Sequence, residues 1–98
     1  KNIVLPLNLS KDTKQKLSLA IEIAQHFNSC VHIITPNETD DVFARQLNNN
    51  MAFAVKHLKA QKIQFTMHIA DGKSGGFADE VLKFAGDKKA DLITMVNF

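Results

Sequence analysis

The sequence has few of the residues that mark specialised scaffolds. Its 98 residues include one cysteine, two prolines and four glycines, with neither tryptophan nor tyrosine. Because Cys30 is alone, the chain cannot close an internal disulfide, so a reducing compartment, the cytoplasm, is the expected location. The scarcity of proline and glycine also excludes a collagen-like chain and a low-complexity linker.

An excess of one charge and a long apolar run are also missing. Twelve Lys and Arg residues oppose ten Asp and Glu residues, which gives a formal net charge of +2, and the basic residues form no long cluster. Such a surface does not indicate nucleic-acid binding. No apolar run approaches the roughly 20 residues that span a bilayer, and Ile3–Leu5 is too short for the core of a signal peptide. We therefore expect neither a nucleic-acid nor a membrane partner.

Hydrophobic residues are frequent enough for one small core. They make up 45% of the sequence. This length predicts a single domain over residues 1–98, and a domain whose sheet has a fifth strand would be truncated before that strand. The chain begins at Lys1 and not at Met, which leaves open a fragment, a trimmed chain and the second half of a tandem protein.

Strand-like and helix-like segments alternate along the chain. Continuous apolar runs, typical of strands buried on both faces, lie at residues 3–5 and 92–96, and residues 30–34 form a second short strand-like segment. Apolar residues recur at helical spacing over residues 17–27, 43–58 and 77–85. This alternation predicts the α/β class, with an open parallel sheet and helices on both of its faces.

Residues 63–69 form a different kind of strand. Here apolar residues alternate with polar ones, which predicts a strand with one buried face at an edge of the sheet. The runs at residues 3–5 and 92–96, the first and fourth strands, are continuous and predict the most buried strands. The expected strand order is therefore 3-2-1-4. In the last helix, Phe77, Val81, Leu82 and Ala85 are expected to face the core.

The order of these segments resembles the universal stress protein family over essentially the whole chain. Residues Lys1–Ser10 are similar to the family's first strand and loop, an apolar run followed by Pro, any residue, Asp, any residue and Ser. The helix with Ala20, Ile21 and Ala24 matches the next segment, and Ala90–Met95 resembles the fourth strand. The resemblance implies a Rossmann-like fold of the adenine-nucleotide alpha-hydrolase type, with strand order 3-2-1-4-5, and a role in stress response.

The resemblance also implies a place for a nucleotide, at the carboxyl ends of the first and fourth strands, where open α/β sheets bind ligands. The candidate residues of this site, which would take ATP or AMP, are Pro6, Leu7, Asn8, Ser10, Val31 and Val96. A loop asparagine and a helix-entry serine are equally ordinary explanations of Asn8 and Ser10.

Two departures from the family pattern fall on this site. The family's loop Asp is Asn8 here. The first glycine of the motif that follows the fourth strand in ATP-binding members falls at Val96, and the chain ends at Phe98. Glycine lets a backbone approach phosphate closely, whereas a β-branched valine fills that space. Both departures argue against ATP binding of the family type.

Other reactive residues have ordinary explanations. His32 and His68 are expected on neighbouring strands, but no third ligand stands at a recognisable spacing for a metal site. Cys30 opens a strand, where a buried, inert thiol is the usual case. No set of nucleophile, base and orienting residue is evident, so we do not expect an enzyme.

The run at 92–96 has no partner for its outer side within these 98 residues, and proteins cover unpaired apolar edges. Either a fifth strand or a partner chain would supply the cover. In the family that strand commonly lies at a two-fold interface, so a homodimer through the fourth-strand side is expected.

The sequence therefore favours a universal-stress-protein-like domain that is not catalytic and acts through dimerisation or partner binding. An AMP- or ATP-binding regulatory module is the alternative, and a subdomain of a larger enzyme or transporter is a third.

Overall fold

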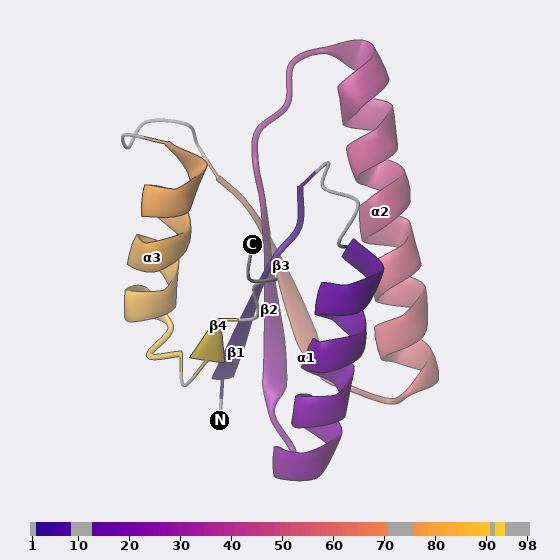
Figure 1. Ribbon diagram of the computed structural model, residues 1–98, viewed down its shortest axis with the longest axis vertical. Coiled ribbons are helices and arrows are strands. Elements are labelled where there is room, and N and C mark those ends of the chain that lie inside the picture. Colours follow the sequence, from indigo (N-terminus) through magenta and orange to yellow (C-terminus); the bar gives the residue numbers. More distant parts are fainter. Residues whose placement is uncertain (1, 9–12, 71–75, 91, 94–98) are drawn as a thin grey trace.

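Helices and strands alternate throughout the computed structural model, which describes residues 2–8, 13–70, 76–90 and 92–93. Figure 1 shows the arrangement. The elements are β1 (Asn2–Pro6), α1 (Thr13–Phe27), β2 (Cys30–Thr35), α2 (Asp41–Ala60), β3 (Phe65–Ile69), α3 (Phe77–Asp87) and β4 (Leu92–Ile93). This is the predicted alternation, and each described element overlaps the segment expected for it.

The four strands form one parallel sheet in the order β3-β2-β1-β4. β1 pairs with β2 from Asn2 opposite Cys30 to Pro6 opposite Ile34. β3 pairs with the other side of β2, and β4 pairs with the other side of β1. The predicted strand order and parallel direction are confirmed.

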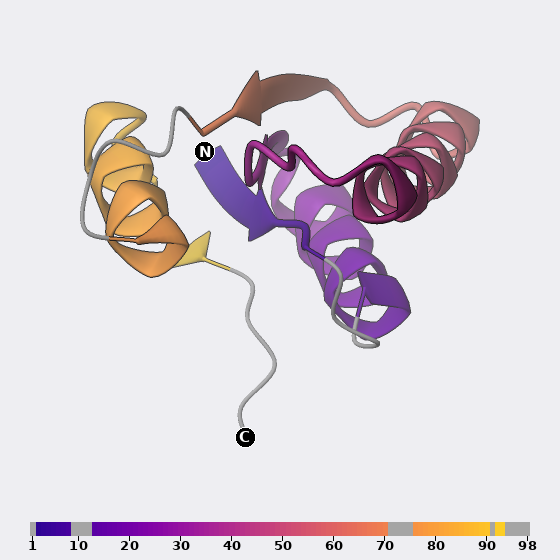
Figure 2. The same cartoon turned by 90° about the horizontal axis from the view of Figure 1, so that it is seen from above.

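Helices cover both faces of the sheet, as predicted (Figure 2). α1 and α2 lie on one face, called the front here, and α3 lies on the other, the back. The front core holds alternate residues of β1 and β2, such as Leu5 and Ile33, together with Leu17 and Ala20 of α1 and Leu58 of α2. The back core joins Val4 and Ile34 to Val81, Phe84 and Ala85 of α3.

Local residues set the ends of the helices. The Asp40 carboxylate accepts hydrogen bonds from the backbone N–H groups of Val42 and Phe43, at 3.0 and 3.1 Å, and so caps the start of α2. α1 ends where Asn28 adopts a φ of 53°, a left-handed conformation that asparagine tolerates well. The backbone N–H of Ser29 then returns to the carbonyl of Ala24.

β3 is the edge strand that the alternation predicts, but its apolar face is less covered than expected. Phe65 is half-buried, whereas Met67 and Ile69 are 47% and 61% exposed. Leu82 of α3 is also exposed, at 62%, although its place in the sequence pattern predicts burial. The alternation predicts which face a side chain takes, but not whether a helix lies over it.

No helix among the described residues is both long enough and apolar enough to cross a membrane.

Candidate functional site

The end of β1 forms one part of the carboxyl edge of the sheet. Leu7 extends the pairing beyond the strand, because its N–H donates to the carbonyl of Ile34 at 2.9 Å. Pro6 and Leu7 are buried, and Asn8 is half-buried. The amide of Asn50, on α2, donates to the carbonyl of Asn8 at 3.1 Å. This bond joins Asn8, just beyond the end of β1, to the second helix of the front face.

The end of β2 forms the adjoining part of this edge. Thr35 is buried, and its carbonyl accepts a hydrogen bond from the N–H of Ala70 at 2.8 Å. The three neighbouring strands β1, β2 and β3 therefore end together around Leu7, Thr35 and Ala70. In an open parallel sheet this is the edge that binds ligands.

The structure brings together three of the predicted site residues, Pro6, Leu7 and Asn8. Val31 lies apart from them, because it is the second residue of β2 and pairs with Ile3 and Phe65 toward the amino end of the strands. Its side chain is fully buried in the front core. Ser10 and Val96 lie outside the described residues.

Two residues of α1 that the sequence analysis did not single out also belong to this edge. Thr13 and Lys16 stand in the first turn of the helix, directly after the loop from β1, and both are buried. A lysine buries its aliphatic stem more readily than its ammonium group. The sequence does contain a signal for the burial of Lys16, because this lysine stands on the side of the helix where apolar residues face the core.

The side chains of this edge carry groups that can bind a ligand. The Asn8 amide can donate and accept hydrogen bonds, and an ammonium group such as that of Lys16 attracts anions. Asn8, Thr13 and Lys16 each also take part in a further interaction within the protein. Among the described residues, no three His, Cys, Asp or Glu side chains gather as metal ligands would.

A second polar cluster lies on the back face, around His32. Its Nε2 is 2.9 Å from Oδ1 of Asn2, and its Nδ1 is 2.7 Å from the hydroxyl oxygen of Thr66. The Asn2 amide nitrogen donates to the carbonyl of Lys88 at 3.0 Å, so its oxygen faces the imidazole. His32 therefore carries its proton on Nε2, and Nδ1 of the neutral ring accepts from Thr66. This chain of bonds ties β1, β2 and β3 to the end of α3.

Burial lowers the pKa of His32 below its usual value, and the positive charge of Lys88 lowers it further. His68 lies on the same face and stacks on Phe84 with ring centroids 4.8 Å apart, while His32 meets the edge of that ring at 6.4 Å. Since both nitrogens of His32 take part in hydrogen bonds, the imidazole acts as a connector between strands.

Cys30 lies at the start of β2, on the same face of the sheet as His32. Burial raises the pKa of its thiol above the usual value, and the charge of Lys88 offsets part of that rise. A raised pKa leaves less of the nucleophilic thiolate at neutral pH.

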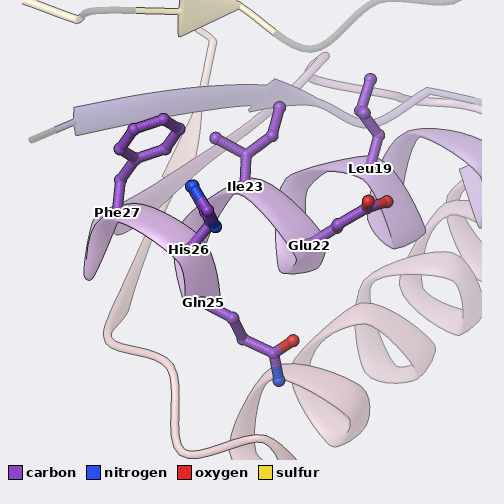
Figure 3. Close-up of a pocket in the computed structure, with 6 residues that line it drawn as sticks. All are labelled: Leu19, Glu22, Ile23, Gln25, His26 and Phe27. Atoms are coloured by element: carbon purple, nitrogen blue, oxygen red, sulfur yellow. The ribbon is translucent and has the colours of Figure 1, made fainter.

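The side of α1 that is turned toward β1 and β4 carries an apolar stripe, shown in Figure 3. Leu19, Ile23 and Phe27 follow one another at every fourth position and point toward β1 and β4, whereas Gln25 points toward α2. There the Gln25 amide donates to Gln61 at 2.7 Å. Leu19 and Phe27 are 42% and 49% exposed. With Glu22, Gln25 and His26, the stripe lines an open groove of about 570 Å³.

No known family model matches the sequence, and no curated protein matches it either. Solved structures do match the fold. A protein of the universal stress protein family from Burkholderia pseudomallei is 16% identical, with a TM-score of 0.76, over 94% of this chain and 77% of that chain.

A universal stress protein from Archaeoglobus fulgidus is 18% identical, with a TM-score of 0.77, over 95% of this chain and 73% of that chain. A protein from Mycobacterium tuberculosis, also 18% identical, has a TM-score of 0.66 over 95% of this chain and 68% of that chain. The fold predicted from the resemblance is therefore confirmed: this chain is a small α/β domain with the fold of the universal stress proteins.

Proposed function

We propose that this chain is a stress-response domain of the universal stress protein type that acts by binding a partner, first of all a second copy of itself, and not by catalysis. The cytoplasm is the location that the lone Cys30 favours. The solved structures that share the fold support the stress-response role, since two of them are described as universal stress protein family members.

The apolar stripe of α1 is the observation that carries this proposal. Leu19, Ile23 and Phe27 line an open groove beside the β1–β4 side of the sheet. Half-exposed apolar side chains in one continuous stripe are typical of a surface that another molecule covers. Burial of this stripe would be the main favourable contribution to association, since each square ångström of apolar surface removed from water contributes about 25 cal/mol.

The side of the sheet on which the stripe lies favours a second copy as the partner. β4 is the outermost described strand on that side, and an outer strand together with an apolar helix flank forms one continuous surface. A two-fold axis there would bring the same surface of each copy together, as in most homodimers.

Sedimentation velocity of the full-length protein at micromolar concentrations tests this proposal. We expect the protein to self-associate, and we expect Leu19→Arg to lower its average mass in solution by placing a charge in the stripe. Leu82→Arg is the control, because Leu82 is also an exposed leucine, at 62% against 42% for Leu19, and lies on the opposite helical layer. A wild-type monomer, or a dimer that Leu19→Arg leaves unchanged, would contradict a dimer formed through this side.

A nucleotide-binding regulatory module is the second candidate. The amide of Asn8 and the lysine at the start of α1 lie at the sheet edge where such ligands bind, and they offer hydrogen bonds and positive charge to a nucleotide. The missing loop carboxylate and the valine at position 96 oppose it.

Calorimetry of the full-length protein with ATP and with AMP, with and without Mg²⁺, decides between the candidates. We expect weak or absent binding, and a sub-micromolar dissociation constant would overturn that expectation. If Asn8 and Val96 alone account for the loss, the double change Val96→Gly with Asn8→Asp restores some affinity.

A further inference from the structure

The edge of the sheet formed by β3 lies on the opposite side from the proposed dimer surface and has unusual composition. β3 pairs only with β2 among the described strands. Exposed edge strands are normally protected from other chains by charged residues, proline or a bulge. Residues 64–70 contain no Lys, Arg, Asp, Glu or Pro, and Met67 and Ile69 are exposed. The usual protection against strand pairing is therefore missing.

The register of β3 shows which backbone groups face outward. The N–H of Val31 donates to the carbonyl of Gln64, and the N–H of Ala70 donates to the carbonyl of Thr35. In a parallel ladder alternate residues of a strand bond to the same neighbour, so residues 64, 66, 68 and 70 bond to β2. The N–H and C=O groups of Phe65, Met67 and Ile69 consequently point away from the sheet.

These three residues are spaced so that the strand can pair with itself. In an antiparallel pair centred on Met67, Met67 lies opposite its own copy, and Phe65 lies opposite Ile69 of the other copy. All three are outward-facing, so each pair exchanges two hydrogen bonds, about six in total. A centre on Thr66 or His68 would instead place backbone groups that already bond to β2 at the middle of the new pair.

The side chains match in the same register. Phe65, Met67 and Ile69 lie on the front face, so the pair would bring together apolar side chains of both copies, which contribute to strand pairing when they lie opposite one another. On the back face Thr66 would lie opposite His68. Because no charged residue occurs between 64 and 70, the two-fold axis brings no like charges together.

The adjoining side of α2 continues this surface. Met51 and Val55 are half-buried and lie on the side of α2 turned away from Phe53. Phe53 lies on the α1 side of α2, where Lys14 stands over its ring at 5.5 Å. The front of the sheet edge therefore offers apolar side chains from two elements.

From this register we infer that β3 is a second self-association surface, at which two copies of the chain join their sheets through antiparallel β3 strands centred on Met67. The surface is distinct from the stripe on α1, so this inference does not depend on the proposed dimer.

Cysteine crosslinking tests the register directly. In a Cys30→Ala background, Met67→Cys places two cysteines in a hydrogen-bonded antiparallel pair, with Cα atoms about 5.5 Å apart, within the range that a disulfide spans. Thr66→Cys is the matched control, because its two copies would lie about 8 Å apart, beyond disulfide reach. We expect Met67→Cys to form a covalent dimer under mild oxidation at least tenfold faster than Thr66→Cys. Equal rates for the two variants would overturn the inference.

A charge at the centre of the strand provides a second test without cysteine. Met67→Lys would place two ammonium groups next to each other at the two-fold axis, and its exposed position leaves the core intact. In sedimentation equilibrium we expect this change to weaken β3 association at least tenfold in Leu19→Arg protein, where the α1 surface is already disrupted. Leu82→Lys in the same background should have no effect. An unchanged dissociation constant for Met67→Lys would contradict the inference and leave the α1 proposal standing.

Discussion

The front and back faces of the sheet achieve burial in different ways. Among the described residues, the front core joins ten buried apolar side chains from the sheet side and from two helices, whereas the back core joins six from the sheet side and from one helix. The back face replaces part of the missing apolar contact with the hydrogen-bonded chain through Asn2, His32 and Thr66. Apolar burial on the front is nondirectional and insensitive to pH, while the back depends on hydrogen-bond geometry and on a titratable ring.

The two faces meet at adjacent residues of β2, which allows a matched comparison. Ile33 points to the front and Ile34 to the back, and both are almost completely buried. The residue type and its burial are the same at both positions. A difference in unfolding free energy between equivalent substitutions therefore reflects the packing around each side chain.

The largest effect is expected when these isoleucines are truncated. Ile33→Ala should lower the free energy of unfolding by about 2–5 kcal/mol, through lost burial and a cavity that two helices cannot fill. Ile34→Ala should cost less, because one helix can shift more easily to fill the space. Urea unfolding followed by circular dichroism measures both. An equal or larger loss for Ile34→Ala would show that the back core is at least as rigid as the front core.

The second effect concerns the connector on the back face. His32→Ala removes the partner of both Asn2 and Thr66 and should lower the unfolding free energy by about 1–3 kcal/mol, toward the lower end because Thr66 can turn to water. His26→Ala, at an exposed histidine of α1, should change it by less than about 0.5 kcal/mol. If both variants cost the same in urea unfolding, the hydrogen-bonded chain does not stabilise the back face.

The sequence predicts the architecture well because the signals that carry it are local. A continuous apolar run identifies β1, a short strand-like segment identifies β2, and helical spacing identifies the helices. The alternation in residues 63–69 correctly indicates an edge strand. The exposure of Met67 and Ile69 could not be predicted, because it depends on how far α2 extends over β3. Leu82 shows the same limit, since the core side of α3 is instead centred on Val81, Phe84 and Ala85.

The candidate site is harder to predict because it depends on contacts between distant residues. Pro6 ends a strand and Leu7 and Asn8 follow it, so all three could be placed at its carboxyl end from sequence alone. The bond from Asn50 to Asn8 joins residues 42 positions apart, and no pattern indicates it. Val31 was placed at the site by resemblance, but the register of β2 sets it toward the other end of the strand. Residue type alone does not reveal the burial of Lys16, because a lysine in a helix usually faces water.

A third, smaller effect distinguishes the two faces by pH. The pKa of His32 is lowered in the folded protein, so between that value and about 6.5 the unfolded chain binds more protons than the folded one. The contribution of the neutral ring to stability is therefore complete above about pH 6.5 and is lost as the pH falls toward the folded-state pKa. Protonated Nδ1 can still donate to Thr66, so the loss comes from burial and from Lys88, and not from a broken bond.

Unfolding measured from pH 7.5 down to pH 5 should show this loss in the wild type. His32→Gln should reduce the slope, whereas His26→Gln should leave it unchanged. A slope that is the same in all three proteins would mean that His32 does not couple folding to pH.

The smallest effect is expected at Cys30, which lies beside the same back-face cluster. Burial raises the pKa of the thiol and Lys88 opposes the rise, so the folded protein should hold less thiolate at pH 7 than the unfolded chain. Reaction with a thiol reagent such as Ellman's reagent should therefore be slower in the native protein than in urea, and should accelerate with pH about tenfold per unit below the pKa.

Lys88→Gln should slow the reaction of Cys30 a few-fold further by removing the opposing charge. Lys83→Gln, at an exposed lysine elsewhere on α3, should not. Because the charge of Lys88 lowers the pKa of Cys30 and that of His32, the same variant should also raise the pKa of His32. The loss of unfolding free energy at acid pH should then be smaller. If Lys88→Gln changes only one of the two groups, the back face does not act as a single electrostatic cluster.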